Sequence, residues 1–544
     1  MVRVRGVAGG EQRQRGDQRA GPRERRRERG QRDEQSARAA QTGAEAGEAE
    51  RHLGGASESA GRSSSRRRRR AGAARYSRAT ARRTLAMSEP FPNLEDLDRA
   101  HLLHPITEFR VHEKKGPRVL VGGEGIRLRT RDGRSVIDGF SGLFNINVGH
   151  GRREIADAVA AQMRELAYYP SFWDFSTQPA IALADRLAQR FPPAAELGHM
   201  IFTSGGSDAN ETAFRFARLY QAVMGRPSRT KILSRKHGFH GITRASGSAT
   251  RIGVYHVFAQ PDPLHVDAAA PYCFRCDLGK TYPSCGVACA DDVEAVIARE
   301  GEDTVAAVIV EPVLGTGGIV PPPAEYFAKL QAICARHDVL LLLDEVITGF
   351  GRTGRWFGME HWDVRPDLVT FAKGVTSGYL PLGGVAMSQR VYEAIRDRSP
   401  QGLPFMGGLT YNNHPTCCAA ALANLDILER EGLVENARVT GAYLLACLRE
   451  AFSDHAFVGD LRGLGMLAAI ETTQPHSKDP VGGKPMQFPA RVAQAAWERG
   501  LIVRALWENV ALAPPLVATR ADVDEIVDIL AKSFAEASKQ FAAA

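Results

Sequence analysis

From residue 87 onward, short apolar runs alternate with amphipathic segments, and this alternation limits the fold more than any other feature of the chain. The runs lack strict polar–apolar alternation, which is typical of strands buried on both faces. Amphipathic stretches, including residues 208–224 and 325–337, lie between several of them. We therefore predict an α/β fold in which helices cover a largely parallel sheet. The runs are residues 199–203, 231–234, 305–310, 339–343 and 368–371.

The two ends of the chain have a different pattern from the middle. Glycine-rich turns separate three β-branched runs near the start, as in an antiparallel meander. We predict a large central domain, residues 151–424, and a smaller α+β domain formed by residues 87–150 and 425–544. The elements expected at the ends are strands at 119–123, 126–130 and 135–138, a helix at 154–167, a long helix after residue 425, two strands near 461–471 and a helix from 521.

Residues 1–86 differ in composition from the rest. They contain 23 Arg, no Lys and ten acidic residues, a net charge of +13, which leaves −5 for the remainder of a chain whose formal charge is +8. Because large apolar side chains are almost absent, we expect a disordered tail. The run Arg66–Arg70 could contact nucleic acid or an anionic surface, but a solvated tail without such a partner is favoured. Met87 directly precedes the first domain-like sequence, so the tail could also be an upstream extension of the true start.

The sequence also predicts a cytoplasmic protein without a membrane partner. No apolar stretch approaches the roughly 18–20 residues of a membrane span. The tail lacks the apolar core of a secretory signal, and its ten acidic residues argue against a transit peptide. Cys334, Cys417, Cys418 and Cys447 lie in helical-looking apolar sequence, which fits a reducing compartment.

A first candidate site residue follows four consecutive leucines. Residues 340–343 lead directly into Asp344 and Glu345. In an open α/β sheet, ligands bind beyond the carboxyl ends of the strands, which is where Asp344 would lie. A buried carboxylate needs a cationic or protonated partner, because burying it alone is costly. Asp344 is therefore a candidate for binding such a group, and the alternative is a helix cap or a structural ion pair.

A lysine follows the next predicted strand, 29 residues after Asp344. Lys373 ends an apolar run and enters a glycine-rich loop, 374–383. Desolvation in an apolar pocket disfavours the ammonium and lowers the pKa of a lysine. A neutral amine can form a Schiff base with an aldehyde cofactor. The alternative is a surface lysine at a turn.

A turn upstream has the form of a phosphate cradle. Residues 202–207, Phe-Thr-Ser-Gly-Gly-Ser, run from a predicted strand through glycines into a predicted helix. Glycines let backbone N–H groups approach an anion, and the helix N-terminus adds a favourable dipole. The alternative is that Ser207 and the residues after it only cap the helix. The turn lacks G-x-G-x-x-G spacing, which argues against a dinucleotide-binding dehydrogenase.

Together these segments resemble the class III (omega) aminotransferases of the pyridoxal-phosphate fold-type I group. The resemblance rests on Leu-Asp344-Glu-Val-x-Thr-Gly-Phe-Gly-Arg-Thr-Gly, on Ala-Lys373-Gly-x-Thr-Ser-Gly-Tyr-x-Pro-Leu-Gly, and on their separation. It spans roughly residues 100–535. It implies a large domain that binds pyridoxal phosphate (PLP) and a homodimer, or a tetramer, whose active site is shared between subunits.

The resemblance also implies roles for individual residues. Lys373 would form the Schiff base and later move the proton between substrate and cofactor, and Asp344 would pair with the pyridinium nitrogen. Val346 would pack on one ring face. The phosphate would be bound by Gly206 and Ser207, and by Thr410 across the dimer interface.

One position departs from the family pattern. The aromatic stacking residue is usually Tyr in a Tyr-His-Gly triplet, and here the triplet is Phe239-His240-Gly241. Phe239 keeps the stacking face but lacks the hydroxyl, while His240 is expected at the cofactor as well. We expect an altered rate or specificity, with the cofactor retained.

On the substrate side, Arg504 stands where omega-amino acid:pyruvate aminotransferases have a mobile arginine that binds a carboxylate. A structural arginine that neutralises an acid is the alternative. Glu311 matches the family's Glu-Pro motif near the cofactor. Phe144 and Phe172, with neighbouring aromatic residues, could line the substrate pocket or belong to the core.

The expected reaction moves an amino group to a keto acid, with pyruvate favoured as the acceptor. The donor would be an amine whose nitrogen is not alpha to a carboxylate, such as beta-alanine, taurine, 4-aminobutyrate or a diamine. One alternative is an aminomutase or decarboxylase on the same scaffold. Another is a catalytically silent dimeric binding module, against which the joint presence of Lys373 and Asp344 argues.

Four cysteines form a C-x2-C…C-x3-C pattern: Cys273, Cys276, Cys285 and Cys289. This spacing can bind structural zinc, but the second pair is looser than in most zinc ribbons. Free thiols in a loop are favoured, and we predict no metal.

Overall fold

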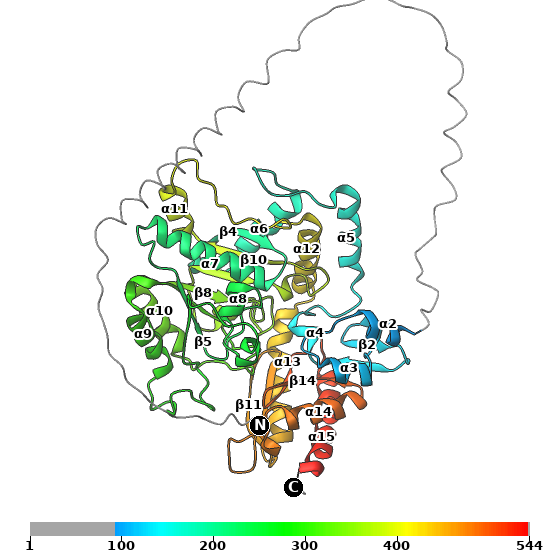
Figure 1. Ribbon diagram of the computed structural model, residues 1–544. Helices are drawn as coiled ribbons and strands as arrows, with labels where there is room; N and C mark the ends of the chain where they lie inside the picture. Colours follow the sequence, from blue (N-terminus) through cyan, green and yellow to red (C-terminus); the bar gives the residue numbers. More distant parts are fainter. Residues whose placement is uncertain (1–92, 542–544) are drawn as a thin grey trace, which may run out of the picture. The chain divides into compact units, whose positions relative to one another are not determined.

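The computed structural model of the protein describes residues 93–541, which form three β-sheets and the helices around them (Figure 1). The tail predicted for residues 1–86, the run Arg66–Arg70 and the alternative start at Met87 lie outside the described residues. Within residues 93–541, no helix combines the length and the apolar character that crossing a membrane requires.

The central sheet has seven strands in the order β4-β10-β9-β8-β7-β5-β6. The strands from β9 to β6 pair in parallel, whereas β10 runs antiparallel to both of its neighbours. The prediction of a largely parallel α/β sheet is therefore confirmed. Its strands are β4 (Leu197–Thr203), β5 (Lys231–Arg235), β6 (His265–Ala268), β7 (Val305–Val310), β8 (Leu340–Asp344), β9 (Leu368–Phe371) and β10 (Gly383–Ser388).

The leucine run of β8 shows why this sheet is buried on both faces. Leu341 and Leu343 belong to the core shared with α6, α9, α10 and α12, while Leu340 and Leu342 belong to the core shared with α7 and α11. Successive side chains of a strand point to opposite faces, so apolar residues are required at every position. The helices on the two sides of the sheet are visible in Figure 1.

Two strands of this sheet were not predicted. β6 is only four residues long, and β10 begins with Gly383 and Gly384, which have low strand propensity. The structure explains the second glycine, because a Cβ at Gly384 would lie 2.5 Å from the Phe371 ring. Close packing against β9 therefore requires glycine at position 384, directly after the predicted loop 374–383.

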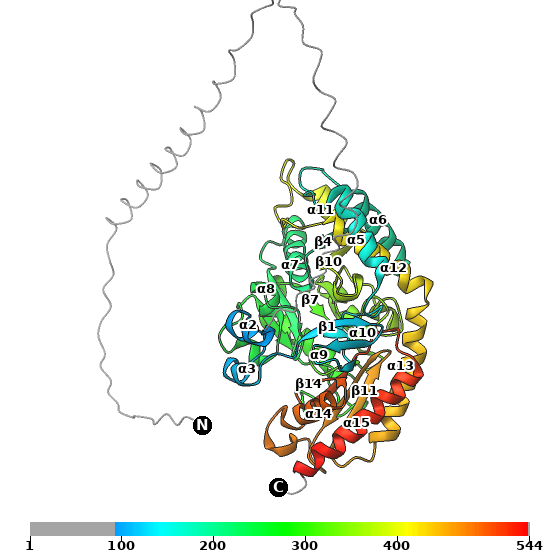
Figure 2. The ribbon, with the colours of Figure 1, turned by 90° about the vertical axis from the view of Figure 1, so that its right-hand side faces the viewer.

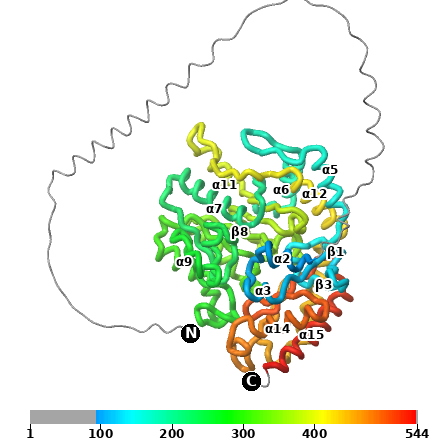
Figure 3. Tube along the Cα trace, turned by 45° about the vertical axis from the view of Figure 1, so that its right-hand side comes forward, coloured from blue at the N-terminus to red at the C-terminus, as the bar shows by residue number. Residues whose placement is uncertain are grey.

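The two ends of the chain share a sheet. The meander β1 (Leu120–Glu124), β2 (Arg127–Thr130) and β3 (Ser135–Asp138) is antiparallel as predicted. β13 (Leu501–Ile502) joins it by pairing in parallel with β3. Figure 3 shows this blue and cyan N-terminal part beside the orange and red C-terminal part.

The rest of the C-terminal part packs around a third sheet, in the order β11-β12-β15-β14. α13 and α15 lie side by side over this region (Figure 2). The domain boundary predicted at residue 425 falls inside α12, and the division into domains stays a prediction. The strands are β11 (Val458–Leu464), β12 (Leu467–Thr472), β14 (Arg504–Leu506) and β15 (Asn509–Leu512).

The α-helices include those predicted at 154–167, 208–224, 325–337, after 425 and from 521. They are α2 (Leu94–His101), α3 (Phe109–Lys115), α4 (Ser141–Phe144), α5 (Arg153–Leu166), α6 (Gln178–Arg190), α7 (Gly206–Val223), α8 (Arg244–Ala249), α9 (Ala288–Glu300), α10 (Tyr326–Arg336), α11 (Gln389–Arg398), α12 (Pro415–Arg430), α13 (Leu433–Phe452), α14 (Gln487–Glu498) and α15 (Arg520–Phe541).

Candidate active site

Lys373 lies just after the carboxyl end of β9, at the start of a single 3-10 turn, Lys373–Val375. Its φ angle is +44°, in the left-handed region that residues other than glycine rarely adopt. Such conformations cluster at functional sites, where the surrounding structure holds them in place. Lys373 therefore has a backbone conformation that it shares with other non-glycine residues of the structure and that its surroundings must stabilise.

The amine of Lys373 lies in a desolvated and charged environment. Its pKa is lowered from 10.5 to about 8, because burial disfavours the ammonium more than the carboxylates of Asp344 and Glu311 favour it. The charge of Arg504 lowers the pKa further. Nζ is 5.7 Å from the centre of the Phe144 ring. The structure thus brings together Lys373 and four other residues named from the sequence.

Asp344 ends β8, the strand next to β9, and is buried. Its Oδ2 accepts a hydrogen bond of 2.8 Å from Asn210 Nδ2 and lies 2.8 Å from His240 Nδ1. Its Oδ1 accepts a hydrogen bond from the backbone N–H of Val346 at 3.1 Å. Three partners therefore hold the carboxylate in one orientation.

Asn210 was not predicted as a site residue. It lies on the first turns of α7, is fully buried, and also donates to the carbonyl of His240 at 2.7 Å. Thr370 Oγ1 donates to its Oδ1 at 2.8 Å and orients the amide. The sequence signal for this role was the position of Asn210, one turn into the helix that follows the glycine-rich turn. The sequence alone indicated only a possible helix cap there.

The glycines at and near the start of α7 allow close contacts that a side chain would block. A Cβ at Gly206 would lie 3.0 Å from a Val346 methyl group, so the start of α7 and the segment after Asp344 are in contact. Gly241, with φ +131°, allows the approach of Ser207 Oγ, which a Cβ there would meet at 2.6 Å. The helix N-terminus adds free N–H groups and a favourable dipole.

Glu311 supports the loop that carries Phe239. Its Oε1 accepts a hydrogen bond from the Phe239 N–H at 3.1 Å, and its Oε2 accepts one from the Gly315 N–H at 2.8 Å. Burial raises the pKa of Glu311. The Phe239 ring packs edge-on against Tyr255, with centroids 5.4 Å apart.

Arg504 lies on β14, with its guanidinium 5.8 Å from the centre of the Phe140 ring. Phe140 in turn packs against Phe144, with ring centroids 4.3 Å apart. Burial lowers the pKa of Arg504. Arg504 forms no ion pair with any residue of the described part of the chain, so the structural alternative of a neutralised acid has no support there.

Thr410 and Phe172 are not joined to this group. No hydrogen bond or ring contact within residues 93–541 connects either of them to Lys373 or Asp344. Thr410 is exposed, and its carbonyl accepts a hydrogen bond from Tyr168 at 2.5 Å. Phe172 packs near Trp173, with ring centroids 5.5 Å apart. Their predicted roles remain predictions.

The four cysteines of the C-x2-C…C-x3-C pattern line one small cavity but are free thiols. Burial raises the pKa of Cys289 to about 12. Among the described residues, no three of these sulfurs lie within 4.8 Å of one another, as a shared ion would require. The structure therefore gives the zinc interpretation of this loop no support.

The residues present fit PLP. A glycine-lined helix N-terminus can bind the phosphate, a buried carboxylate can face a protonated ring nitrogen, and an amine of lowered pKa can react with the aldehyde. These groups follow the carboxyl ends of three strands, β4, β8 and β9, on the same side of the central sheet. The carboxyl ends of the strands are the usual ligand site of such a fold.

Comparison with known proteins agrees with this geometry. The family described as Aminotransferase class-III matches residues 109–534. The diaminobutyrate–2-oxoglutarate transaminase of Halomonas elongata is 43% identical over 447 residues, 80% of this chain and 94% of the relative. The putrescine–pyruvate aminotransferase of Pseudomonas aeruginosa is 36% identical and covers 80% of this chain and 94% of its own length.

Solved structures give the same result. The (S)-enantioselective omega-transaminase from Thermomicrobium roseum has a TM-score of 0.77 and 42% identity, with 82% of this chain and 98% of that chain covered. An amine transaminase from an uncultivated Pseudomonas species, in the PLP-bound form, has a TM-score of 0.76 and 38% identity, with 80% and 98% covered. The chain therefore belongs to the class III aminotransferases and is a PLP-dependent transaminase of fold type I.

Proposed function

We propose that this transaminase takes its amino group from an omega-amino acid or amine and transfers it to pyruvate. The donors would be compounds such as beta-alanine, taurine, 4-aminobutyrate or a diamine. The observation that carries the proposal is the state of Arg504. It has no ion-pair partner within the described structure, and its positive charge lowers the pKa of the Lys373 amine. An unpaired guanidinium at this position can bind the carboxylate of a substrate.

The proposed role of Lys373 is to bind the aldehyde of PLP as a Schiff base and then to move a proton at the substrate carbon. The lowered pKa supports both steps, because a neutral amine is the nucleophile and the base. When bound, PLP supplies an aromatic ring that accepts electrons from the substrate. Asp344 would lie opposite the ring nitrogen, held there by Asn210 and His240.

The remaining cofactor contacts are proposed from their positions. Val346 and Phe239 would pack on the two ring faces, and Gly206 and Ser207 would bind the phosphate. Thr410 would reach the phosphate of a second subunit. Its exposure in the single chain supports a homodimer, or a tetramer built from such dimers.

The choice of acceptor follows from the charge near Lys373. Pyruvate carries one carboxylate, which Arg504 alone can bind, whereas 2-oxoglutarate carries two and needs a second cation. Arg504 is the arginine whose charge acts on the Lys373 amine. The two relatives described above are named for different acceptors, 2-oxoglutarate and pyruvate. We therefore base the choice of pyruvate on the charge near Lys373.

Two aromatic residues near Lys373 also support an amine donor over a bulky polar donor. Phe140 and Phe144 place two packed aromatic rings between Arg504 and Lys373, and both are buried. Phe172 could complete this wall if the loop that carries it closes over the site. An apolar spacer between amine and carboxylate would lie against these rings. A cytoplasmic location is proposed with this function, since all eight cysteines are free thiols.

The decisive experiment is a matrix of donors against two keto acids. Purified enzyme with PLP would be incubated with each donor and with either pyruvate or 2-oxoglutarate, and the amino acid formed would be identified. Alanine formed in preference to glutamate supports the proposal. Glutamate as the main product would overturn the acceptor, and carbon dioxide or a rearranged amine without alanine would favour a decarboxylase or aminomutase.

A further inference from the structure

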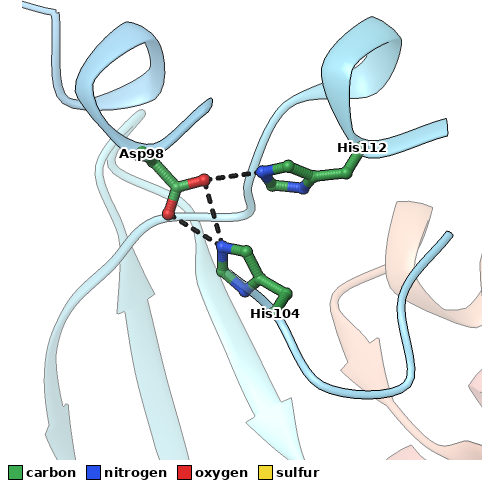
Figure 4. A group of neighbouring side chains, drawn as sticks. All are labelled: Asp98, His104 and His112. Carbon is green, nitrogen blue, oxygen red and sulfur yellow. Dashed lines mark hydrogen bonds and ion pairs between the residues drawn. The ribbon is translucent and has the colours of Figure 1, made fainter. Parts of the chain in front are cut away.

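A separate cluster of metal-ligating side chains lies at the start of the described chain. Asp98 comes from α2, His112 comes from α3, and His104 lies in the segment between these helices (Figure 4). None of the three is part of the site around Lys373. Their side chains converge because the chain folds back between the two helices.

The three side chains of the cluster converge closely enough to share one ion. His104 Nε2 lies 2.9 and 3.1 Å from the two carboxylate oxygens of Asp98, and His112 Nε2 lies 2.8 Å from Asp98 Oδ1. The two imidazole centroids are 4.5 Å apart. The three ligand atoms all lie within 4.8 Å of one another, a condition that this group alone meets within residues 93–541.

His112 provides the observation that points to a bound ion. Its Nε2 is buried and close to Asp98 Oδ1, yet it is not aligned for a hydrogen bond with that oxygen or with any other described residue. A buried ring nitrogen without a hydrogen bond is costly. A cation coordinated by this nitrogen and by the carboxylate would satisfy both atoms, with the two ligand atoms moving apart from their present 2.8 Å.

Apart from an ion pair of Glu95 on α2 with Arg131 at 2.8 Å, few contacts hold the two helices that carry the cluster. α2 and α3 have eight and seven residues, contain no buried residue, and are too short to be stable alone. Leu103 and Ile106, in the segment between them, are 77% and 76% exposed. Apolar packing within the chain therefore does not link the two helices, whereas the Asp98 cluster does.

We propose that Asp98, His104 and His112 form a binding site for a divalent transition-metal ion of the zinc type, which cross-links α2 and α3. Two imidazole nitrogens and one carboxylate oxygen suit zinc, whereas calcium and magnesium prefer oxygen ligands alone. The side chain of His104 is 32% exposed, so water can complete the coordination.

The test uses the full-length, untagged protein with PLP bound. After dialysis against a chelator and then against chelator-free buffer, ZnCl₂ alone is titrated by calorimetry and metal content is measured by mass spectrometry. We expect one zinc per chain. Asp98→Asn, His104→Asn and His112→Asn should each weaken binding by at least about 100-fold, because even residues that only orient a metal ligand cost 10–100-fold.

A matched control is available on the same helix. His101 is exposed, lies on α2 and is not part of the cluster, so His101→Asn should bind zinc like the unmodified protein. Zinc should raise the melting temperature of the unmodified protein and of His101→Asn, but not that of His112→Asn. Without added zinc, the cluster variants should keep their PLP absorption and transaminase activity, which shows that they are folded.

Two results would overturn the proposal. One is an unmodified protein that binds no zinc, or a His112→Asn variant that binds it as tightly as the unmodified protein. The other is zinc binding that survives in His112→Asn but is lost in Cys276→Ser/Cys285→Ser, which would assign the ion to the cysteine loop. If His112→Asn loses its PLP absorption, the more exposed His104→Asn gives the answer.

Discussion

The amine of Lys373 and the ring of Phe144 face each other across 5.7 Å, and both residues have positive φ angles, +44° and +63°. Neither is glycine, so each conformation costs on the order of 1–2 kcal/mol, which the packing around the residue must offset. Lys373 lies two residues beyond the end of the buried strand β9, and Phe144 belongs to the tightly packed aromatic pair with Phe140. The fold therefore holds an amine and an apolar surface at a defined separation.

Replacing Lys373 by Ala should lower kcat by about 10⁴-fold, because the proposed nucleophile and proton carrier is lost. The measurement is single-turnover transamination, combined with borohydride reduction and peptide mapping of the unmodified enzyme, which should place the cofactor on residue 373. Lys329→Ala, which removes a surface ion pair with Asp291, is the control and should stay fully active. A reduced adduct at another lysine would refute the assignment.

Cofactor uptake should depend on pH through the amine of Lys373. Its pKa is lowered to about 8, so the amine is protonated and unreactive below pH 8 and neutral above it. The rate at which cofactor-free protein takes up PLP should therefore rise with pH, with a midpoint near 8. A free alkylamine measured alongside should show its midpoint near 10.5. A protein midpoint near 10.5 would show that the site does not desolvate the amine.

Asn210→Ala should lower kcat by about tenfold with little change in the substrate KM. The variant removes one hydrogen bond to the ionised Asp344, and such bonds contribute about 1.5–3 kcal/mol. Gln221→Ala is a matched control, because Gln221 is another buried amide of α7 that binds the carbonyl of Ala306. It should lower the melting temperature while leaving kcat unchanged. An equal loss of kcat in both variants would mean that the effect is general destabilisation.

Phe239→Ala should weaken PLP binding about tenfold, because stacking on an aromatic face contributes about 0.5–1.5 kcal/mol beyond burial. Phe239→Tyr should keep the affinity and change only the rate or the substrate preference, since the ring is retained. Equilibrium dialysis of PLP and kcat/KM for two donors would check both variants. Unchanged PLP affinity in Phe239→Ala would remove this residue from the proposed site.

Arg504→Ala should raise the KM for pyruvate and for omega-amino acids by about 10–100-fold, because a charge-assisted pair with the substrate carboxylate is lost. The KM for a simple amine without a carboxylate should not change. Arg499→Ala, which removes an exposed pair with Glu536, is the control. Loss of activity toward both kinds of donor would indicate a structural role for Arg504 instead.

The sequence was sufficient for the parts that depend on neighbours along the chain. Apolar runs predicted five strands of the central sheet. β8 ends at Asp344, and β9 ends two residues before Lys373. These features could be predicted because burial on both faces imposes an apolar residue at each strand position. β10 was not predicted because it begins with glycines. Gly384 is required by contact with Phe371, and that contact forms only when β10 pairs with β9.

What the sequence by itself determined was therefore the family, most of the strands of the central sheet, and the two residues proposed to carry its chemistry, Asp344 and Lys373. Only the tertiary structure decided which side chains surround them: Asn210 and His240 reach Asp344 from 134 and 104 residues away, and Phe144 reaches Lys373 from the N-terminal part. It also brought Asp98, His104 and His112 together, which no pattern in the sequence had indicated. The physical reason is that strand and helix patterns are set by local periodicity, whereas such contacts exist only after distant segments pack together.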